Sequence, residues 1–277
     1  MKKTIITLSV FFSLSAGLVS CSKSEDSKTN NTTNPPANTT VEYVQVNKEL
    51  SMDITGTWCP PCGSYGIPGF NRAVKISNNN MIPLSVHSND ALSCATGNEL
   101  MAYAPFKSSS VPRITMGNGL LFPAGVYSDT NATAGKIISA LVDSAAGDVI
   151  IGTTISNMKT ADGKLTFDVN SKFFIDATGD YYMAVYILED GIVEPQKKSD
   201  GTTNAKQVHD HVLRGTANST FGESWATGTT KAATINKKSY SVTIPATWKA
   251  ANLHVAAVVW SKVGTKYYFV NGNTTYK

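Results

Sequence analysis

The spacing of hydrophobic and polar residues differs between two parts of the chain, and the change falls near residue 148. Before it, short segments with β-branched residues or alternating apolar and polar positions predict strands at residues 41–46, 50–55, 81–87 and 113–116. Apolar positions with helical spacing predict helices over about 91–106 and 132–146. Alternating strands and helices predict a two-layer or three-layer α/β domain over residues 41–147.

From residue 148 to residue 277 the apolar period becomes two. Turn signals such as Asp162-Gly163 separate seven short segments that we predict to be strands, at 148–158, 164–174, 180–189, 206–214, 238–245, 252–260 and 266–272. Closely spaced strands without a long helix are typical of an immunoglobulin-like β-sandwich. The predicted fold class is therefore α+β and multidomain, with an α/β domain followed by an all-β sandwich.

The N-terminus has the features of a lipoprotein export signal. Lys2 and Lys3 precede an apolar run over residues 5–19, which is too short to span a bilayer. The run ends in Leu-Val-Ser-Cys21, which looks like a bacterial lipobox, so we expect residues 1–20 to be removed and Cys21 to carry the lipid. Residues 21–40 are polar and contain two adjacent prolines, which predicts a disordered tether.

Composition narrows the class of partner. Charged residues make up 16% of the chain, and loss of Lys2 and Lys3 with the signal lowers the formal charge from +4 to +2. No basic stretch for nucleic acid emerges, so we expect no nucleic-acid partner. Abundant Ser, Thr and Asn residues are usual in exported β-rich bacterial proteins.

The segment "GTWCPPCG" at residues 56–63 carries the most specific candidate chemistry. A C-x-x-C pair after a strand and at the start of a helix resembles the thioredoxin arrangement. The helix start would lower the pKa of Cys59, the attacking thiol, while Cys62 would resolve the mixed disulfide. No cofactor is implied.

Three further residues fit this interpretation. Asp53 lies six positions before Cys59 on the predicted strand, which resembles the position of the buried carboxylate that moves protons for the resolving thiol in thioredoxins. The alternative is that Asp53 is only a capped carboxylate at a strand end. Val111-Pro112 resembles the cis-proline loop that faces such a dithiol and would hold a partner peptide. We expect Trp58 to wall the site. By contrast, the glycines and Pro68 after Cys62 predict a helix that is short, kinked or late to begin.

Two alternatives to a working dithiol remain. A zinc site would need more ligands, and His87 and Cys94 are companions at a spacing unlike any zinc module. Export also removes the reducing pool, so the pair could be a permanently closed disulfide. We expect Cys94 to be a buried, inert thiol.

A second constellation lies in the β-rich half, in "YILEDGIVEPQ" at 186–196 and "VHDHVLRG" at 208–215. If 206–214 is one strand, His209 and His211 share a face and could bind a metal with Glu189 or Glu194. The alternative is that both histidines make interstrand hydrogen bonds and Arg214 pairs with Glu189 or Asp190.

Six motifs taken together resemble the outer membrane protein 28 family of Bacteroidetes-type lipoproteins. They are the lipobox, "TGTWCPPCG", "LEDGI", "VHDHVLRG", "IPATWKAANLHVAAVVW" and a late "VNG". The resemblance covers most of residues 43–273. It implies a thioredoxin-like domain followed by a β-sandwich, an outer-membrane address, and a dithiol at Cys59 and Cys62. It implies little about the reaction, because members are described as outer-membrane proteins or adhesins.

Two functions follow as hypotheses. The first is a membrane-anchored thiol-disulfide oxidoreductase that acts on exported protein thiols and disulfides. The second is a non-enzymatic surface-binding protein or adhesin in which Cys59–Cys62 is structural. A metal-binding protein that uses His209 and His211 is a weaker third.

Overall fold

The computed structural model describes residues 41–107, 110–122 and 129–276. The predicted signal peptide, the lipid-anchor residue Cys21 and the tether therefore lie outside the described residues. Within these ranges, no helix has both the length and the apolar character needed to cross a bilayer.

The first half of the described chain alternates strands with helices. Its strands are β1 (Glu49–Thr55), β2 (Met81–His87), β3 (Arg113–Met116) and β4 (Leu120–Phe122). Its helices are the π-helical turn η1 (Cys62–Gly66), α1 (Ile67–Ile76), α2 (Ala95–Ala102) and α3 (Thr130–Ser144). The strands predicted at 50–55, 81–87 and 113–116 are confirmed.

The strand predicted at 41–46 is wrong, since residues 41–48 form no strand. Side chains satisfy this backbone instead of a ladder: Thr154 Oγ1 donates to the Glu42 carbonyl over 2.7 Å, and Asn271 Nδ2 donates to the Val46 carbonyl over 3.0 Å. Helix α2 is shorter than predicted because Tyr103 takes an extended conformation at its end. Helix α3 begins at the Asp129 cap, whose carboxylate accepts two backbone N–H bonds.

The second half consists of strands, with one 3-10 turn, η2 (Ala250–Asn252). The long strands are β5 (Ile151–Ala161), β6 (Lys164–Phe173), β8 (Asp180–Glu189), β14 (Ile235–Thr243), β15 (Leu253–Val263) and β16 (Lys266–Thr274). The shorter ones are β7 (Ala177–Thr178), β9 (Ile192–Lys197), β10 (Thr203–His209), β11 (Val212–Thr216), β12 (Glu223–Ala226) and β13 (Thr229–Thr230). The prediction of one strand at 206–214 is wrong: a turn separates β10 from β11, and His211 in this turn has a φ of +57°.

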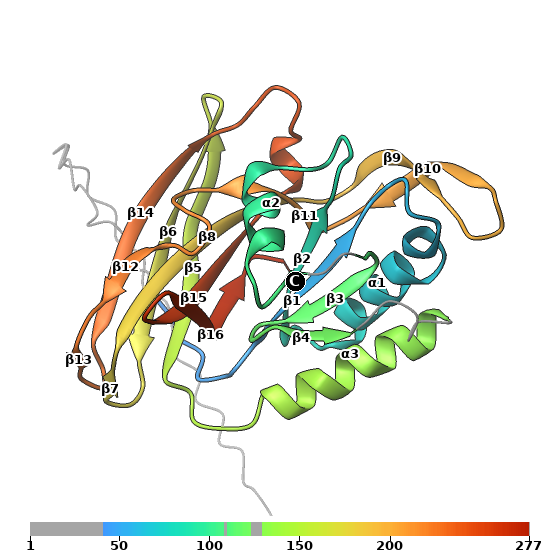
Figure 1. Ribbon diagram of the computed structural model, residues 1–277. Helices are drawn as coiled ribbons and strands as arrows, with labels where there is room; N and C mark the ends of the chain where they lie inside the picture. The colour runs from blue at the N-terminus through green and yellow to red at the C-terminus, as the bar shows by residue number, and fades with distance from the viewer. Residues whose placement is uncertain (1–40, 108–109, 123–128, 277) are drawn as a thin grey trace, which may run out of the picture. The chain divides into compact units, whose positions relative to one another are not determined.

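One mixed sheet joins the two halves, in the order β16-β15-β8-β11-β2-β1-β3-β4, with β12 also paired to β8 (Figure 1). Strand β2 is parallel to β1 and to β11, and the remaining pairs on this path are antiparallel. A second sheet, β14-β6-β5, is antiparallel. The strands β9 and β10 pair only with each other.

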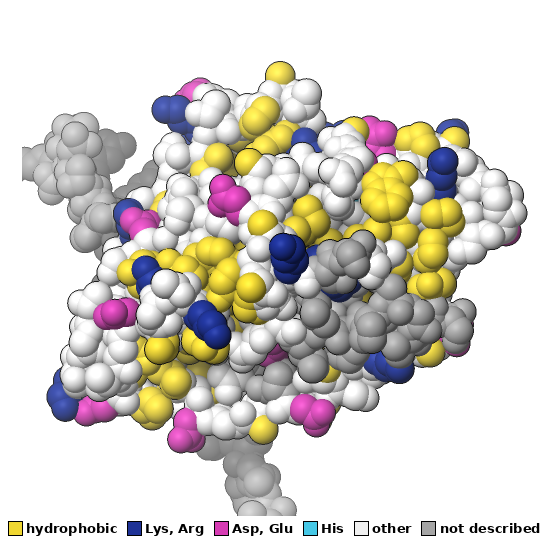
Figure 2. Space-filling model, viewed as in Figure 1, with side chains coloured by type: hydrophobic (Ala, Val, Ile, Leu, Met, Phe, Trp, Pro, Cys, Tyr) yellow, Lys and Arg dark blue, Asp and Glu magenta, His cyan; other side chains and the backbone are white. Residues whose placement is uncertain are grey.

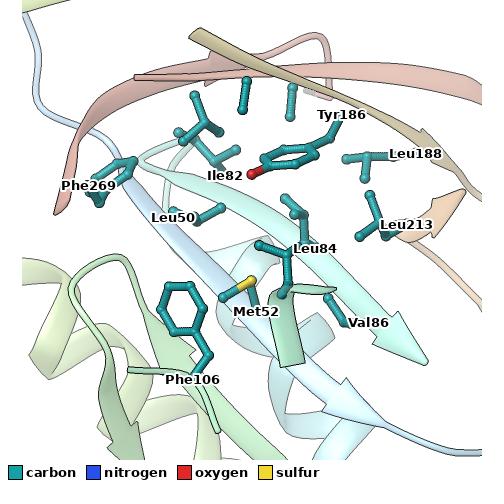
Figure 3. Packing of buried hydrophobic residues seen from close by; sticks show 14 of the residues in the cluster. Leu50, Met52, Ile82, Leu84, Val86, Phe106, Tyr186, Leu188, Leu213 and Phe269 are labelled. Carbon is teal, nitrogen blue, oxygen red and sulfur yellow. The ribbon is translucent and has the colours of Figure 1, made fainter. Parts of the chain in front are cut away.

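Alternation along β8 and β15 explains the layers. Odd-numbered residues such as Met183 and Val255 pack in one core with the β14-β6-β5 sheet, while even-numbered residues such as Tyr186 and Trp260 pack in another. Figure 3 shows the latter core, in which Leu50 of β1 lies near Tyr186. A third cluster packs α1 and α3 against β2 and β3.

The α+β class is confirmed. The predicted arrangement, a thioredoxin-like domain at 41–147 followed by a separate immunoglobulin-like sandwich at 148–277, is not confirmed. Residues 41–277 form one compact unit, and β2 bonds directly to β11 across the expected boundary. A continuous sheet satisfies the edge of β2 that two separate domains would leave open.

Candidate functional site: the dithiol loop and its cover

The dithiol loop, residues 56–64, runs from the end of β1 into the first residues of η1. Cys59 and Cys62 form a disulfide with an S–S length of 2.07 Å and Cα atoms 5.3 Å apart. The Cys62 N–H donates to Cys59 Sγ over 3.2 Å, and the Gly63 N–H donates to the Cys59 carbonyl over 3.3 Å. Because free amides at a helix start favour negative charge, this turn is suited to stabilise a thiolate on Cys59 after reduction.

The helix after the dithiol begins irregularly, as predicted. Residues 62–66 form a π-helical turn in which the Ile67 N–H reaches the Cys62 carbonyl, five residues back. Regular helix starts only at Ile67, and Pro68 occupies its first turn, where a missing N–H is tolerated. The helical turn that the thiolate argument needs is present, but it is wider than an α-helical turn.

The predicted proline loop packs against this turn. The Val111–Pro112 peptide bond is cis. A Cβ atom on Gly66 would lie 2.9 Å from Pro112 Cβ, so the turn approaches the proline ring closely only because residue 66 is glycine. The structure thus brings Pro112 against the helix start that carries Cys62.

Asp53 lies on the strand that leads into the dithiol and is completely buried. Leu50, Met52 and Ile54 point into the core of Figure 3, so Asp53 points to the opposite face of β1, toward Ile114 and the α1 and α3 layer. Neither carboxylate oxygen has a hydrogen-bond partner within the described part of the chain. Burial raises the pKa of Asp53 to about 7.

Trp58 lies over the loop with nearly half of its side chain exposed. Its Nε1 donates to the Ser88 carbonyl over 2.8 Å. Next to it, the Thr57 N–H donates to Asp90 Oδ2 over 2.8 Å, and the same oxygen bonds to His87 Nδ1 at 2.7 Å. These contacts tie the loop to the end of β2.

The β9–β10 hairpin packs against the dithiol loop, a contact that the sequence analysis did not predict. Gln196 Nε2 donates to the carbonyls of Cys59 over 2.9 Å and Gly56 over 3.2 Å. The Lys197 N–H donates to the Thr57 carbonyl over 2.9 Å. A Cβ atom on Gly63 would lie 2.3 Å from the Lys197 carbonyl oxygen, so glycine is required for this close approach.

Both cysteines beneath these contacts are buried, with Cys59 2% exposed and Cys62 fully inaccessible. Gln196 is also fully buried. Its only sequence signal was the glutamine at the end of "YILEDGIVEPQ", and nothing in the strand pattern connected that residue with a loop 137 positions earlier.

The two candidate metal-binding histidines lie in different surroundings. The ring of His209 makes an edge contact with His87, with 5.2 Å between ring centroids. His211 instead packs on Tyr276, with 4.4 Å between centroids. The prediction that they share one strand face is therefore wrong, because the chain turns between β10 and β11. Burial, together with the neighbouring His87, lowers the pKa of His209 to about 4.

Asp190 organises the base of the hairpin. Its Oδ1 accepts the His211 N–H over 2.7 Å, and its Oδ2 lies 3.2 Å from His254 Nε2. Burial would raise the pKa of Asp190, but the hydrogen bonds and charges of His254 and His211 lower it. Arg214 Nε lies 3.3 Å from Glu189 Oε2, which confirms the predicted ion pair.

Cys94 is a free thiol that is half-buried rather than buried as predicted, because it caps α2, with Sγ accepting the Gly97 N–H over 3.4 Å. Burial raises its pKa, which disfavours the reactive thiolate. In the described ranges, no three His, Cys, Asp or Glu side chains gather as a metal site. On the face shown in Figure 2, cationic and anionic side chains are interspersed.

Comparison with known proteins identifies the family. The model of the family described as outer membrane protein Omp28 matches residues 124–268. The solved structure of HBP35 of Porphyromonas gingivalis is similar in fold, with a TM-score of 0.64, 15% identity, and coverage of 84% of this chain and 76% of that one. A domain of the outer membrane lipoprotein Omp28 from Porphyromonas gingivalis matches with a TM-score of 0.29 and 20% identity, over 45% of this chain and 89% of that domain.

No curated protein sequence matches the chain. The family model nevertheless covers more than half of its length. The chain therefore belongs to the Omp28 family of outer membrane proteins and is located at the outer membrane.

Proposed function

We propose that this protein is a lipoprotein, anchored through Cys21, that exchanges disulfides with exported proteins through Cys59 and Cys62. The observation that carries the proposal is a closed Cys59–Cys62 bond at a helix start, after a strand that holds a buried Asp53 with no hydrogen-bond partner among the described residues. Perturbed buried acids beside a reactive pair are typical of catalytic sites.

The order of elements around the dithiol supports a thioredoxin-like interpretation of residues 41–147. Strand β1 leads into the dithiol and α1, β2 returns parallel to β1, and the cis-proline loop precedes the antiparallel β3. Strands β5, β6 and β14 stacked on β8 and β15 likewise support a sandwich-like second half, fused to the first through the shared sheet.

In the proposed reaction the reduced protein attacks first. The Cys59 thiolate attacks one sulfur of a substrate disulfide, which forms a mixed disulfide and releases the other substrate sulfur as a thiolate. The Cys62 thiol loses its proton, and its sulfur attacks Cys59. This step closes the Cys59–Cys62 bond found in the structure and releases the second substrate thiol. The substrate gains two electrons and the protein loses two.

Asp53 is the proposed proton acceptor for Cys62. A carboxylate with a pKa near 7 can both take and return a proton at neutral pH. Its position on β1 supports this role, since β1 contacts both η1, which begins at Cys62, and α1, which continues from η1. Pro112, packed on Gly66, is proposed to border the partner-binding face.

The test uses insulin as the protein disulfide and the reduced protein as donor. We expect wild type to reduce insulin, Cys59→Ser to be inactive, and Cys62→Ser to accumulate a mixed disulfide at Cys59 that mass spectrometry detects. Cys94→Ser is the matched control and should keep wild-type activity. Absence of both turnover and the trapped adduct would contradict the proposal.

Burial of both sulfurs favours a second candidate function. A disulfide with 2% or less of either cysteine exposed can serve as a structural link in a surface-binding protein or adhesin. In that case reduction would require unfolding, and the reactivity of the Cys59–Cys62 bond would follow the stability of the whole unit.

A further inference from the structure

The β9–β10 hairpin stands apart from the two main sheets. Its strands pair with each other through five registered residue pairs and with no other strand of the described residues (Figure 1). The hairpin reaches from the end of β8, beyond the end of β1, and returns into β11. An element that is paired only internally can move without breaking a ladder of the central sheet.

The contacts that hold the hairpin on the dithiol loop are few and specific. Gln196 Nε2 bonds to two loop carbonyls, the Lys197 N–H bonds to a third, and the Ser199 N–H donates to Ser64 Oγ over 2.8 Å. These donors lie on one short stretch, 196–199. Gln196 Oε1 has no partner within the described residues, so the amide is used here as a donor.

A second contact lies near the return of the hairpin. The His209 ring packs on His87, and His209 Nε2 lies 3.3 Å from the Glu194 carbonyl of the facing strand. His87 is fixed through Asp90, which also binds the Thr57 N–H of the dithiol loop. The hairpin therefore contacts the dithiol loop directly at 196–199 and indirectly through this histidine pair.

Both ends of the hairpin are fixed at a compact base. Residues Gly191 and His211 have φ values of +69° and +57°. Asp190 Oδ1 accepts the His211 N–H, and Asp210 Oδ1 accepts the Gly191 N–H over 2.9 Å. These crossed bonds hold the two ends together, so the hairpin can turn about its base as a unit.

From these contacts we infer that the β9–β10 hairpin is a lid over the dithiol, latched by Gln196, and that it must swing away before Cys59 can react. Exchange requires a second sulfur to approach Cys59 Sγ, which the closed structure does not permit at 2% exposure. Lifting the lid frees the Thr57 carbonyl and removes the Gln196 bond from the carbonyls of Gly56 and Cys59, which keep their bonds within the dithiol turn. An extended polypeptide partner could supply the N–H donors that replace those of the lid. The inference rests on the proposed exchange function.

The test measures how fast the Cys59–Cys62 disulfide is reduced in the folded protein by a water-soluble phosphine and by a reduced thioredoxin. We expect Gln196→Ala to accelerate both reactions about tenfold, because two hydrogen bonds of the latch are lost. Ser64→Ala, which removes the bond from the Ser199 N–H to Ser64 Oγ, should give a smaller acceleration. Gln207→Ala is the matched control, since Gln207 lies on the same hairpin and bonds only within it.

Hydrogen exchange gives a second readout. A swinging lid predicts that the Lys197 and Ser199 amides, which bond outside the hairpin, exchange faster in Gln196→Ala, while the amides bonded between β9 and β10 keep their protection. Equal reduction rates and equal Lys197 protection in Gln196→Ala and wild type would overturn the lid.

The two proposals fail in different ways. If Gln196→Ala accelerates reduction but neither protein reduces insulin, the lid stands and the exchange function fails. If wild type reduces insulin but Gln196→Ala changes no rate, the exchange function stands and the lid fails.

Discussion

The carboxylates of Asp53, on β1, and Asp190, just after β8, have opposite surroundings. Asp190 accepts a backbone N–H, lies beside His254, and has a lowered pKa. Asp53 is more deeply buried, has no partner within the described residues, and has a pKa raised to about 7. The hairpin base is built from satisfied pairs, whereas the dithiol end retains an unsatisfied acid.

This difference separates structural from chemical roles. Buried polar groups in folded proteins are nearly always paired, because an unpaired one costs about 1–3 kcal/mol or more. Asp190 and its partners therefore need no function beyond fixing the hairpin base. Asp53 destabilises the fold at neutral pH, and a proton-transfer role explains why an acid occupies that position.

The largest effect is expected for Asp53→Asn. The folded protein holds the Asp53 proton up to a pKa of about 7, while the unfolded chain releases it near 3.8, so wild-type stability falls as pH rises between these values. Asp53→Asn should remove that loss and raise the free energy of unfolding at pH 8 by up to about 4 kcal/mol. Insulin reduction should slow about 100-fold.

Denaturant unfolding at pH 3.5 and pH 8 checks the first part. The two proteins should agree at the acid end, where the carboxyl is protonated in both states. A variant that is less stable than wild type at pH 8 would contradict the orphaned-acid interpretation.

His209→Gln should act in the opposite direction across an overlapping window. The folded-state pKa of His209 is about 4, whereas the unfolded imidazole binds a proton near 6.5. Wild type should therefore lose about 3 kcal/mol of stability from this group as pH falls from 6.5 to 4. Unfolding series in which His209→Gln has the same acid slope as wild type would contradict the burial of this ring against His87.

Asp190→Ala should destabilise the protein by about 2 kcal/mol, because the His211 N–H and the His254 ring lose their acceptor. Thermal unfolding measures the loss. The matched control is Asp200→Ala, an exposed acid that binds Thr202 at the hairpin tip, which should unfold at the wild-type temperature. Equal losses of stability for the two substitutions would contradict the claim that Asp190 fixes the hairpin base while Asp200 lies at a solvent-exposed tip.

The smallest effect is expected for Trp58→Phe. The side chain is 45% exposed and its indole makes a single hydrogen bond to the Ser88 carbonyl, so stability should change by less than about 1 kcal/mol. Insulin reduction should change less than about threefold. A large loss of activity with unchanged stability would show that Trp58 contacts the partner directly.

Local patterns predicted the strands around the dithiol, because β1 alternates apolar with polar residues, and β2 and β3 are short segments rich in apolar residues. The roles expected for Asp53 and for Val111-Pro112 came from the resemblance of "WCPPC" and its neighbours to thioredoxins. The histidine prediction was wrong because strand periodicity does not reveal the turn at residues 210–211. The shared sheet depends on pairing between residues far apart, such as Ser85 with Val212, which no local pattern contains.

The contact of Gln196 with the dithiol loop was equally unpredictable, since it depends on where a hairpin folds back. Gly63 shows the same limit from the other partner. Its role became clear only when the Lys197 carbonyl was found where a side chain would lie. Sequence motifs located the dithiol, and only the three-dimensional structure located the hairpin that packs on it.

The most direct test of the central claim is the reduction potential of the Cys59–Cys62 pair. The Cys21→Ser variant, otherwise unchanged, would be equilibrated against defined glutathione ratios, and reduced Cys59 and Cys62 would be counted by thiol labelling and mass spectrometry. The account predicts a potential above about −250 mV, with Cys59 the first thiol to be alkylated. A potential below about −300 mV, with both sulfurs unreactive until the protein unfolds, would contradict it and mark the bond as a structural link.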